Sequence, residues 1–321
     1  MTSKRHFVID TDPGIDDAQA ILMALSCPDV EVKAVTTVVG NTSALQAARN
    51  GLRILQVAGR LDIPVYVGCT KALLGGVLDN VTEYHGTDGL GDVPDPNAPN
   101  DSSIQPEHAV TALLRLSKEF SGNLSLVAIG PLTNLAMAIR LDPDFGTRLK
   151  ECFIMGGNYR GVGNITASSE FNFYHDAEAA YVVLNQLSCP ITIMPWETCL
   201  AHSLPWDVYH TIRSVGTPKA EFLKRVEAHS LRNNLSSGIK DFLLADEFVM
   251  AIAIDRNVLK NSNTVYATVE VKGHQTYGQM VVDWNGILGK RSNVTIVTSI
   301  DDALFRKMLL RSVDCKDETL L

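Results

Sequence analysis

The stretch that decides the fold is residues 7–18, which read FVIDTDPGIDDA. The short apolar run Phe7-Val8-Ile9 is typical of a buried β-strand, and the Pro-Gly turn that follows leads into a helix expected over residues 17–26. The turn therefore lies at the carboxyl end of a strand. In α/β proteins this edge of the sheet is where ligands bind.

Four carboxylates, at positions 10, 12, 16 and 17, crowd this turn, and no Lys or Arg follows before Lys33. Two unit charges about 4 Å apart repel by about 4 kcal/mol at an effective dielectric of 20. A helix N-terminus stabilises each carboxylate by only about 0.3–1 kcal/mol, which is less than this repulsion. Bound protons or a metal ion must compensate. Because every candidate ligand is oxygen, Ca²⁺ or Mg²⁺ fits better than zinc. The alternative is that Asp16 and Asp17 only cap the helix while the other two lie in a solvated turn.

Outward from this turn, short β-branched runs alternate with helical patterns along the first two hundred residues. The predicted strands cover residues 7–10, 32–39, 63–67, 124–129, 152–155 and 191–194. The predicted helices cover residues 17–26, 43–58, 106–120, 131–141 and 177–187. This alternation implies right-handed βαβ crossovers and a mainly parallel sheet.

The pattern changes after residue 205. Helices are predicted over 205–215, 219–233, 242–255 and 301–313, and strands over 264–272, 277–283 and 294–297. Residues 75–106 show no periodicity, which is typical of a functional loop. We predict a single α/β domain over residues 1–321, with a mainly parallel open sheet flanked by helices and elaborated loops at its carboxyl edge.

Composition narrows the function classes. The 321 residues carry 28 Lys+Arg and 36 Asp+Glu, a net charge of −8, which argues against a nucleic-acid or anionic membrane partner. No uncharged stretch is long enough to span a bilayer, and no signal-peptide pattern begins the chain. The six cysteines have no C-x-x-C spacing and indicate a reducing compartment. We therefore expect a cytoplasmic protein.

Residues 8–18 resemble the D-x-D-P-G-x-D-D signature of the nucleoside hydrolases, the calcium-dependent N-ribohydrolases of the inosine-uridine preferring type. The resemblance continues, in order, through Gly40-Asn41, His85-Gly86, Gly89-Leu90-Gly91, Gly130-Pro131-Leu132-Thr133-Asn134, Met155-Gly156-Gly157, Gly163-Asn164, Glu170-Phe171-Asn172, Asp176 and Asp246. It implies a Rossmann-like nucleoside hydrolase fold, a nucleoside substrate and a homodimer or homotetramer.

The resemblance also implies a Ca²⁺ site that binds the ribose 2′ and 3′ hydroxyls and the attacking water. The implied ligands are the side chains of Asp12, Asp17 and Asp246 and the main-chain carbonyl of Ile129. Asp16 would be the general base, and Asp10 would support the site from behind. Adjacent acids at a helix start point in different directions, so one can hold metal while the next faces the water.

A ribose-binding set is implied as well, and its members are Asn41, Met155, Asn164, Glu170 and Asn172. Amides and a carboxylate supply the donors and acceptors that a polyol needs. Cleavage of the N-glycosidic bond builds positive charge on the ribosyl ring, which carboxylates and oxygen dipoles stabilise more than they stabilise the neutral substrate.

The base side departs from the family pattern. Many members place a His directly before the last metal-binding Asp, where this chain has Ala245, which cannot donate a proton. His85 remains and would lie near the edge of the base. Trp196 would either stack on a base or belong to the core. The other candidate base contacts are Tyr84, His202, His229, Arg232 and Lys240. The leaving-group acid stays open.

The predicted function is hydrolysis of ribonucleosides to ribose and free base. A second reading is a nucleoside or sugar binding protein that has lost catalysis through Ala245. A third is a haloacid-dehalogenase-type phosphatase, which also places D-x-D after its first strand. Such phosphatases usually have Thr or Val two residues after the second Asp, where this chain has Gly14.

Overall fold

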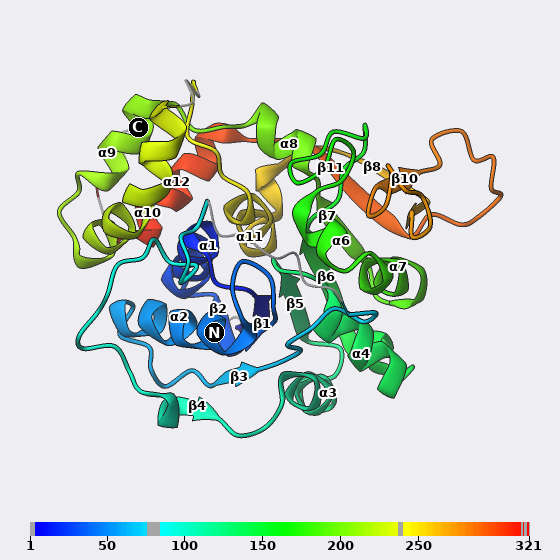
Figure 1. The fold of residues 1–321 in the computed structure, drawn as a ribbon, viewed down its shortest axis with the longest axis horizontal. Coiled ribbons are helices and arrows are strands. Elements are labelled where there is room, and N and C mark those ends of the chain that lie inside the picture. The colour runs from blue at the N-terminus through cyan, green and yellow to red at the C-terminus, as the bar shows by residue number, and fades with distance from the viewer. Residues whose placement is uncertain (1–3, 76–83, 237–239, 316, 318–319, 321) are drawn as a thin grey trace.

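The computed structural model describes residues 4–75, 84–236, 240–315, 317 and 320. Within them, nine strands form one sheet in the order β4-β3-β2-β1-β5-β6-β7-β11-β8 (Figure 1). Neighbouring strands are parallel except β8, which pairs antiparallel with β11. Their bounds are β1 (Arg5–Thr11), β2 (Val30–Thr37), β3 (Val65–Val67), β4 (Ile104–Gln105), β5 (Leu124–Ala128), β6 (Leu149–Met155), β7 (Ile191–Met194), β8 (Leu259–Val265) and β11 (Val294–Ile300). A separate antiparallel pair consists of β9 (Ala267–Val269) and β10 (Met280–Val282).

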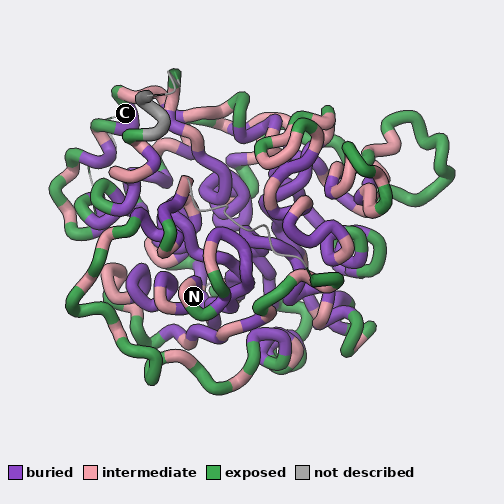
Figure 2. The backbone as a smooth tube through the Cα atoms, viewed as in Figure 1, coloured by how far each residue is buried: buried purple, intermediate pink, exposed green. Residues whose placement is uncertain are grey.

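Helices cover both faces of this sheet because both faces are apolar. Phe7 and Ile9 of β1 pack into one buried cluster, and Val8 between them packs into the other. The helices that contribute to the first cluster are α1 (Ile15–Ser26), α2 (Ala44–Val57), α8 (Trp196–Ala201), α9 (Trp206–Arg213), α10 (Pro218–Ser236), α11 (Asp246–Ile254) and α12 (Asp302–Ser312). Those of the second are α3 (Ala109–Glu119), α4 (Thr133–Leu141), α5 (Phe145–Arg148), α6 (Phe171–His175) and α7 (Ala177–Gln186). The sheet is thus the buried middle layer of three (Figure 2).

The strand order reverses at β1. Strands β2 to β4 are added outward on one side of β1, and β5 returns to its other side. Asp10 pairs with Thr36 of β2 and with Ala128 of β5, and the Ile129 amide donates to the Asp10 carbonyl at 2.8 Å. Such a reversal leaves a crevice outside the carboxyl ends of the two strands, where ligands of open α/β sheets bind. The fold therefore places the aspartate turn and Ile129 side by side.

The predicted mainly parallel α/β sheet flanked by helices is confirmed. Most element bounds agree within about three residues; for example, the helix predicted over 106–120 is α3 (Ala109–Glu119), capped by His108. The strand predicted over 264–272 is wrong, because β8 starts earlier, at Leu259, and β9 holds only three residues. Residues 260–264 of β8 are exposed and polar at the edge of the sheet, so their sequence has no apolar pattern that would predict a strand. Part of the segment predicted as a loop, residues 76–83, lies outside the described residues.

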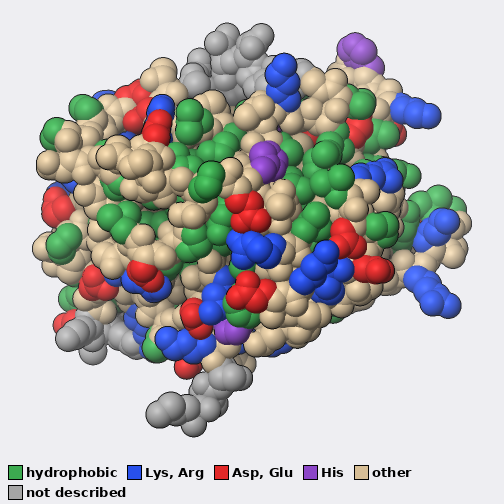
Figure 3. All heavy atoms as spheres, turned by 90° about the horizontal axis from the view of Figure 1, so that it is seen from below, with side chains coloured by type: hydrophobic (Ala, Val, Ile, Leu, Met, Phe, Trp, Pro, Cys, Tyr) green, Lys and Arg blue, Asp and Glu red, His purple; other side chains and the backbone are tan. Residues whose placement is uncertain are grey.

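Surface and thiol chemistry fit the compositional analysis. In the described part of the chain, no helix is long and apolar enough to cross a membrane. On the face seen in Figure 3, basic and acidic side chains are interleaved. All six cysteines are free thiols.

Candidate active site

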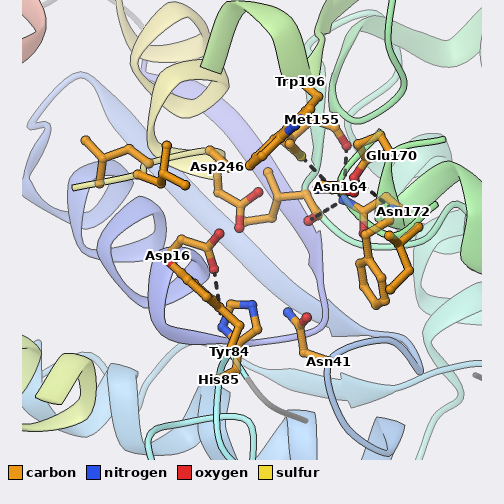
Figure 4. A pocket seen from close by; sticks show the side chains of 16 residues that line it. Asp16, Asn41, Tyr84, His85, Met155, Asn164, Glu170, Asn172, Trp196 and Asp246 are labelled. Atoms are coloured by element: carbon orange, nitrogen blue, oxygen red, sulfur yellow. Dashed lines mark hydrogen bonds and ion pairs between the residues drawn. The ribbon is translucent and has the colours of Figure 1, made fainter. Parts of the chain in front are cut away.

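A cavity of about 450 Å³ opens at the carboxyl edge of the sheet beside the β1–β5 reversal (Figure 4). Its described lining residues are Asp16, Asn41, Tyr84, His85, Ile129, Met155, Asn164, Ile165, Glu170, Phe171, Asn172, Trp196, Leu243, Leu244, Ala245 and Asp246. We call Asp16, Asn41, Asn164, Glu170, Asn172 and Asp246 the polar set. We call Tyr84, Ile165, Phe171, Trp196, Leu243, Leu244 and Ala245 the apolar set. The whole predicted ribose-binding set and His85 line this cavity.

The aspartate turn is held by its own backbone and by the next strand end. The Gly14 amide donates to Asp17 at 2.8 Å, and the Thr11 hydroxyl donates to the other oxygen of that carboxylate. The Asn41 amide donates to Asp12 at 2.7 Å. A Cβ at Gly40 would lie 2.0 Å from the Asp12 carboxylate, so this approach of β2 requires glycine.

Three carboxylates converge on the cavity. One oxygen each of Asp16, Asp17 and Asp246 lie within 4.8 Å of one another. Asp246 begins α11, more than two hundred residues after the turn. Burial, and then the charge of Asp16, raise the pKa of Asp17 to about 7. Burial, and then the charges of Asp16 and Asp17, raise the pKa of Asp246 well above its usual range. Such a cluster is unstable when ionised unless positive charge joins it.

The donor set fits a hard divalent cation. Asp12 is 1 % exposed, and its Oδ1 has no hydrogen-bond partner among the described residues. Burial, and next the charge of Asp17, raise the pKa of Asp12 well above its usual range. An orphaned buried carboxylate oxygen beside other carboxylates is the environment that oxygen-seeking cations such as Ca²⁺ neutralise. The closely spaced trio includes Asp16 and not Asp12, so the predicted general base lies beside two of the predicted metal ligands, Asp17 and Asp246.

Asp10 lies below this cluster, fully buried in β1. Its Oδ1 accepts hydrogen bonds from the Thr36 hydroxyl at 2.5 Å and the Asn134 amide at 2.9 Å. Burial raises the pKa of Asp10 to about 7, against the effect of these two hydrogen bonds. Because Asn134 also donates to the Thr37 carbonyl at 3.0 Å, this network ties the ends of β1 and β2 to the start of α4. Asp10 thus supports the turn from behind.

Glu170 and Asn172 hold the opposite side of the polar set. The Glu170 carboxylate accepts from the amides of Gly157 at 2.7 Å, Asn172 at 2.8 Å and Phe173 at 3.1 Å, and it caps α6. Burial raises the pKa of Glu170 to about 7, although these hydrogen bonds oppose the shift. The Asn172 side-chain amide donates to the carbonyls of Ile129 and Met155, each at 3.2 Å. Asn172 is therefore bonded to the carbonyl that was predicted as a metal ligand.

The loop that carries Asn164 is fixed by Glu197, the second residue of α8. Its carboxylate accepts from the amides of Tyr159 at 2.9 Å, Arg160 at 2.7 Å and Val162 at 3.2 Å. The Asn158 side chain adds hydrogen bonds to the carbonyls of Val162 and Ser168. Asn164 and Ile165 are thereby held over the cavity. Glu197 was not predicted, because a glutamate three residues after a strand end has no distinctive pattern.

The His85 side chain meets the first turn of α1. Its Nδ1 accepts a hydrogen bond from the Ile15 amide at 3.2 Å and lies 3.8 Å from an Asp16 oxygen. A nitrogen that accepts a hydrogen bond carries no proton, so the proton of the neutral ring is on Nε2. Burial lowers the pKa of His85, and His229 adds to that effect while Asp16 opposes it.

The other candidate base contacts divide into two groups. Tyr84 and Trp196 line the cavity. His202 instead contacts Asp302 at 2.7 Å from the end of α8, and neither His202 nor His229 is among the described residues that line the cavity. Among the described residues, Arg232 and Lys240 do not line the cavity either. The apolar residues Ile165, Phe171, Leu243 and Leu244 were not predicted to line the cavity. Leu243 and Leu244 fall in the helix predicted over 242–255, but α11 begins only at Asp246 and leaves both residues in the segment before it.

This geometry is matched by known proteins. The sequence model of the family described as inosine-uridine preferring nucleoside hydrolase matches residues 7–307. The chain belongs to this family. As a nucleoside hydrolase it is an N-glycosyl hydrolase, and the predicted family and enzyme class are confirmed.

Relatives of this nucleoside hydrolase cover nearly its whole length. The inosine-uridine preferring nucleoside hydrolase of Leishmania major is 34% identical over 92% of this chain and 93% of its own. The pyrimidine-specific ribonucleoside hydrolase RihB of Escherichia coli is 32% identical over 94% and 95%. The solved inosine-guanosine nucleoside hydrolase superposes with a TM-score of 0.90 at 30% identity, over 98% of this chain and all of that one.

Proposed function

We propose that this chain hydrolyses the N-glycosidic bond of ribonucleosides to ribose and free base, using a water that Asp16 deprotonates beside a bound Ca²⁺. The observation that carries the proposal is the convergence of three carboxylate oxygens within 4.8 Å at one end of a cavity lined by amides and a glutamate. Oxygen donors of this kind prefer a hard cation. When bound, such a cation makes water easier to deprotonate and attracts sugar hydroxyls.

Burial separates the roles of the aspartates. Asp12, Asp17 and Asp246 are at most 3 % exposed, so solvent does not compensate their charge, and we assign them with the Ile129 carbonyl to the cation. Asp16 differs, since 20% of its side chain is exposed and it lines the cavity. A carboxylate that faces the cavity reaches a water molecule there and accepts its proton. Asp10, tied to Thr36 and Asn134, keeps the turn in place.

The remaining polar set suits a ribose. Asn41, Asn164, Glu170 and Asn172 offer amide and carboxylate groups to hydroxyls, and Met155 offers a soft apolar contact to the ring. As the bond to the base breaks, positive charge grows on the ribosyl ring. Prearranged carboxylate and amide oxygens stabilise that charge more than they stabilise the neutral nucleoside, which is the condition for acceleration.

Membership of the family does not show which nucleobase the substrate of this chain carries. The names of the three relatives given above specify inosine and uridine, pyrimidines, or inosine and guanosine. In this chain the residue before Asp246 is Ala245, whose side chain has no proton to give, and Ala245 lines the cavity. The His85 imidazole lies 3.8 Å from Asp16, and its Nε2 proton is available for a hydrogen bond to a base.

The test is release of reducing sugar from uridine, inosine, cytidine, adenosine and guanosine, with and without a chelator. We expect release that the chelator abolishes and that Ca²⁺ restores. Activity that survives chelation would overturn the metal assignment and leave the hydrolase assignment intact. Calcium-dependent nucleoside binding without any release of sugar would instead show a binding protein.

Two further outcomes distinguish the remaining readings. Release of phosphate from a phosphomonoester, with no ribose released from nucleosides, would point to a phosphatase. The expected assembly is a homodimer or homotetramer, and the mass of the protein in solution, measured by light scattering, checks it. A monomeric mass would contradict that part of the proposal alone.

A further inference from the structure

Asn50, in the middle of α2, lies outside the cavity and is completely buried. Its side-chain amide has two N–H groups. One N–H donates to the carbonyl of Pro13 at 3.0 Å, and the other donates to the carbonyl of Asp88 at 2.8 Å. Because both carbonyls can only accept, they fix which end of the amide is nitrogen, and the Oδ1 accepts from the Gln46 side chain at 3.1 Å. All the donors of Asn50 are thus used on two separate loops of the active site.

Pro13 belongs to the aspartate turn, and Asp88 belongs to the loop of residues 84–93, which carries Tyr84 and His85. The internal hydrogen bonds of this loop set its shape. Asp88 accepts from the amides of Leu90 and Asp92, and Asp92 accepts from the Asp88 amide at 3.0 Å and the Thr87 hydroxyl at 2.6 Å. None of these bonds sets the position of the loop relative to α1.

Contacts with neighbouring helices set that position. On the α2 side, the Arg53 guanidinium donates to the Val93 carbonyl at 2.6 Å and lies 3.5 Å from Asp88, one helical turn from Asn50. On the α10 side, Gly91 packs so closely that a Cβ there would lie 2.0 Å from the Val226 carbonyl. The loop is therefore wedged between α2 and α10, and Asn50 alone of these residues also holds the aspartate turn.

We propose that Asn50 is a positioning residue that fixes the His85 loop against the aspartate turn, and so sets the separation of His85 from Asp16. This inference rests on the proposed function, because it concerns how the reacting groups are placed. The 3.2 Å bond from the Ile15 amide to His85 joins the same two loops. That single bond is long, and a bridge from Asn50 to both loops keeps it aligned.

The test replaces Asn50 by Asp. The two side chains have the same shape, but an ionised carboxylate has no N–H and faces two carbonyl oxygens in the same place. Misplacement of a reacting group by about 1 Å costs about 10²-fold in rate. We expect kcat/KM to fall roughly 30-fold. Gln46→Ala removes a hydrogen bond from the same amide without breaking the bridge, and we expect it to stay within about twofold of the parent.

A double-mutant cycle separates positioning from general damage. If Asn50 acts through His85, Asn50→Asp in a His85→Ala background lowers kcat/KM by less than about threefold further. The same 30-fold loss in both backgrounds would overturn the proposal, as would an Asn50→Asp variant with parental kcat/KM. If Asn50→Asp does not fold, Arg53→Lys takes its place in the cycle. Arg53→Lys loses the hydrogen bond to the Val93 carbonyl, and we expect it to lower kcat/KM by less than Asn50→Asp would. This loss should also appear only when His85 is present.

A measurement that does not depend on catalysis tests the positioning role of Asn50 separately from the proposed hydrolase function. The ¹⁵N chemical shifts of the His85 ring report which nitrogen carries the proton. In the parent protein we expect an unprotonated Nδ1 and a protonated Nε2, and in Asn50→Asp a mixture of the two neutral forms. Unchanged shifts in the variant would contradict the positioning role. If no nucleoside is hydrolysed but the shifts change, the proposed function fails and the bridge stands.

Discussion

The polar and apolar sets of the cavity are built in different ways. In the polar set, Asp16, Glu170, Asn172 and Asp246 lie at the starts of helices, and hydrogen bonds with main-chain groups fix side chains such as those of Glu170 and Asn172. Members of the apolar set come from irregular segments and from the first residues of α6 and α8, and packing holds them. Directed hydrogen bonds therefore hold the polar set, whereas packing holds the apolar set. We expect the chemistry common to all nucleosides to depend on the first set and the choice of base to depend on the second.

The largest expected effect comes from Asp16 of the polar set. Asp16→Asn keeps the shape of the side chain and removes its capacity to take a proton, so kcat should fall about 10³-fold for every nucleoside. Ca²⁺ affinity, measured by calorimetry, should stay within about tenfold, because the more deeply buried carboxylates remain. Asp17→Asn is the matched control and should lose both Ca²⁺ binding and turnover. Near-parental turnover in Asp16→Asn would remove this residue from the role of general base.

Asn172 provides the next largest effect, because it bonds the carbonyls of Ile129 and Met155 from a position that is 4 % exposed. Asn172→Leu removes hydrogen bonds to two buried carbonyls and a ribose contact, so kcat/KM should fall about 10²-fold, or roughly 3 kcal/mol. The loss should be equal for all five nucleosides. Trp196→Leu, in the apolar set, should instead change the ratios between bases. A base-dependent loss in Asn172→Leu would show that the two sets do not act separately.

The packing beneath the polar set is tested by His175, at the end of α6. The ring is 5 % exposed, both of its nitrogens lack hydrogen-bond partners among the described residues, and burial lowers its pKa to about 4. Between pH 6.5 and 4 the unfolded chain binds a proton here that the folded chain does not, so stability is present above pH 6.5 and is lost as the pH falls. His175→Leu should recover about 2 kcal/mol at pH 5 and remove this part of the acid dependence.

Urea unfolding at pH 5 and pH 7.5 measures this effect. The control is His274→Leu, which replaces an exposed imidazole and should leave the pH dependence unchanged. If His175→Leu and the parent lost stability equally between the two pH values, the folded protein would have to protonate His175 without cost. Water or another polar group would then have to reach the His175 ring in the folded protein.

The sequence predicts the polar set better than the apolar set for a physical reason. An aspartate cluster after an apolar strand requires compensation, so the charges of residues 10–17 are enough to identify a site. The end of each parallel strand then places Asn41, Ile129 and Met155 at the same edge. Roles within the cluster are harder to predict, because spacing alone does not show that Asp16 lies with Asp17 and Asp246 and that Asp12 lies outside this trio.

The elements of the fold also differ in how well the sequence predicts them. Buried strands such as β5 are predicted within one residue because both faces are apolar. The polar edge strand β8 and the short helices α6 and α8 are not, since their residues follow no apolar period. Those helices carry Phe171 and Trp196 into the cavity. Asn50 and Glu197 were missed for a related reason, because their function depends on main-chain groups far away in the sequence.

The smallest expected effect comes from Ala245, where the two sets meet beside Asp246. Ala245→His would place an imidazole in the cavity, able to protonate a departing base when its pKa is near the working pH. Without the supporting contacts that orient an evolved acid, the gain in kcat should be about fivefold for the poorest leaving group. A riboside with a 4-nitrophenol leaving group needs no proton and should gain nothing. Ala245→Asn controls for size and polarity, and an equal gain with both leaving groups would show that the added side chain acts on the ribose.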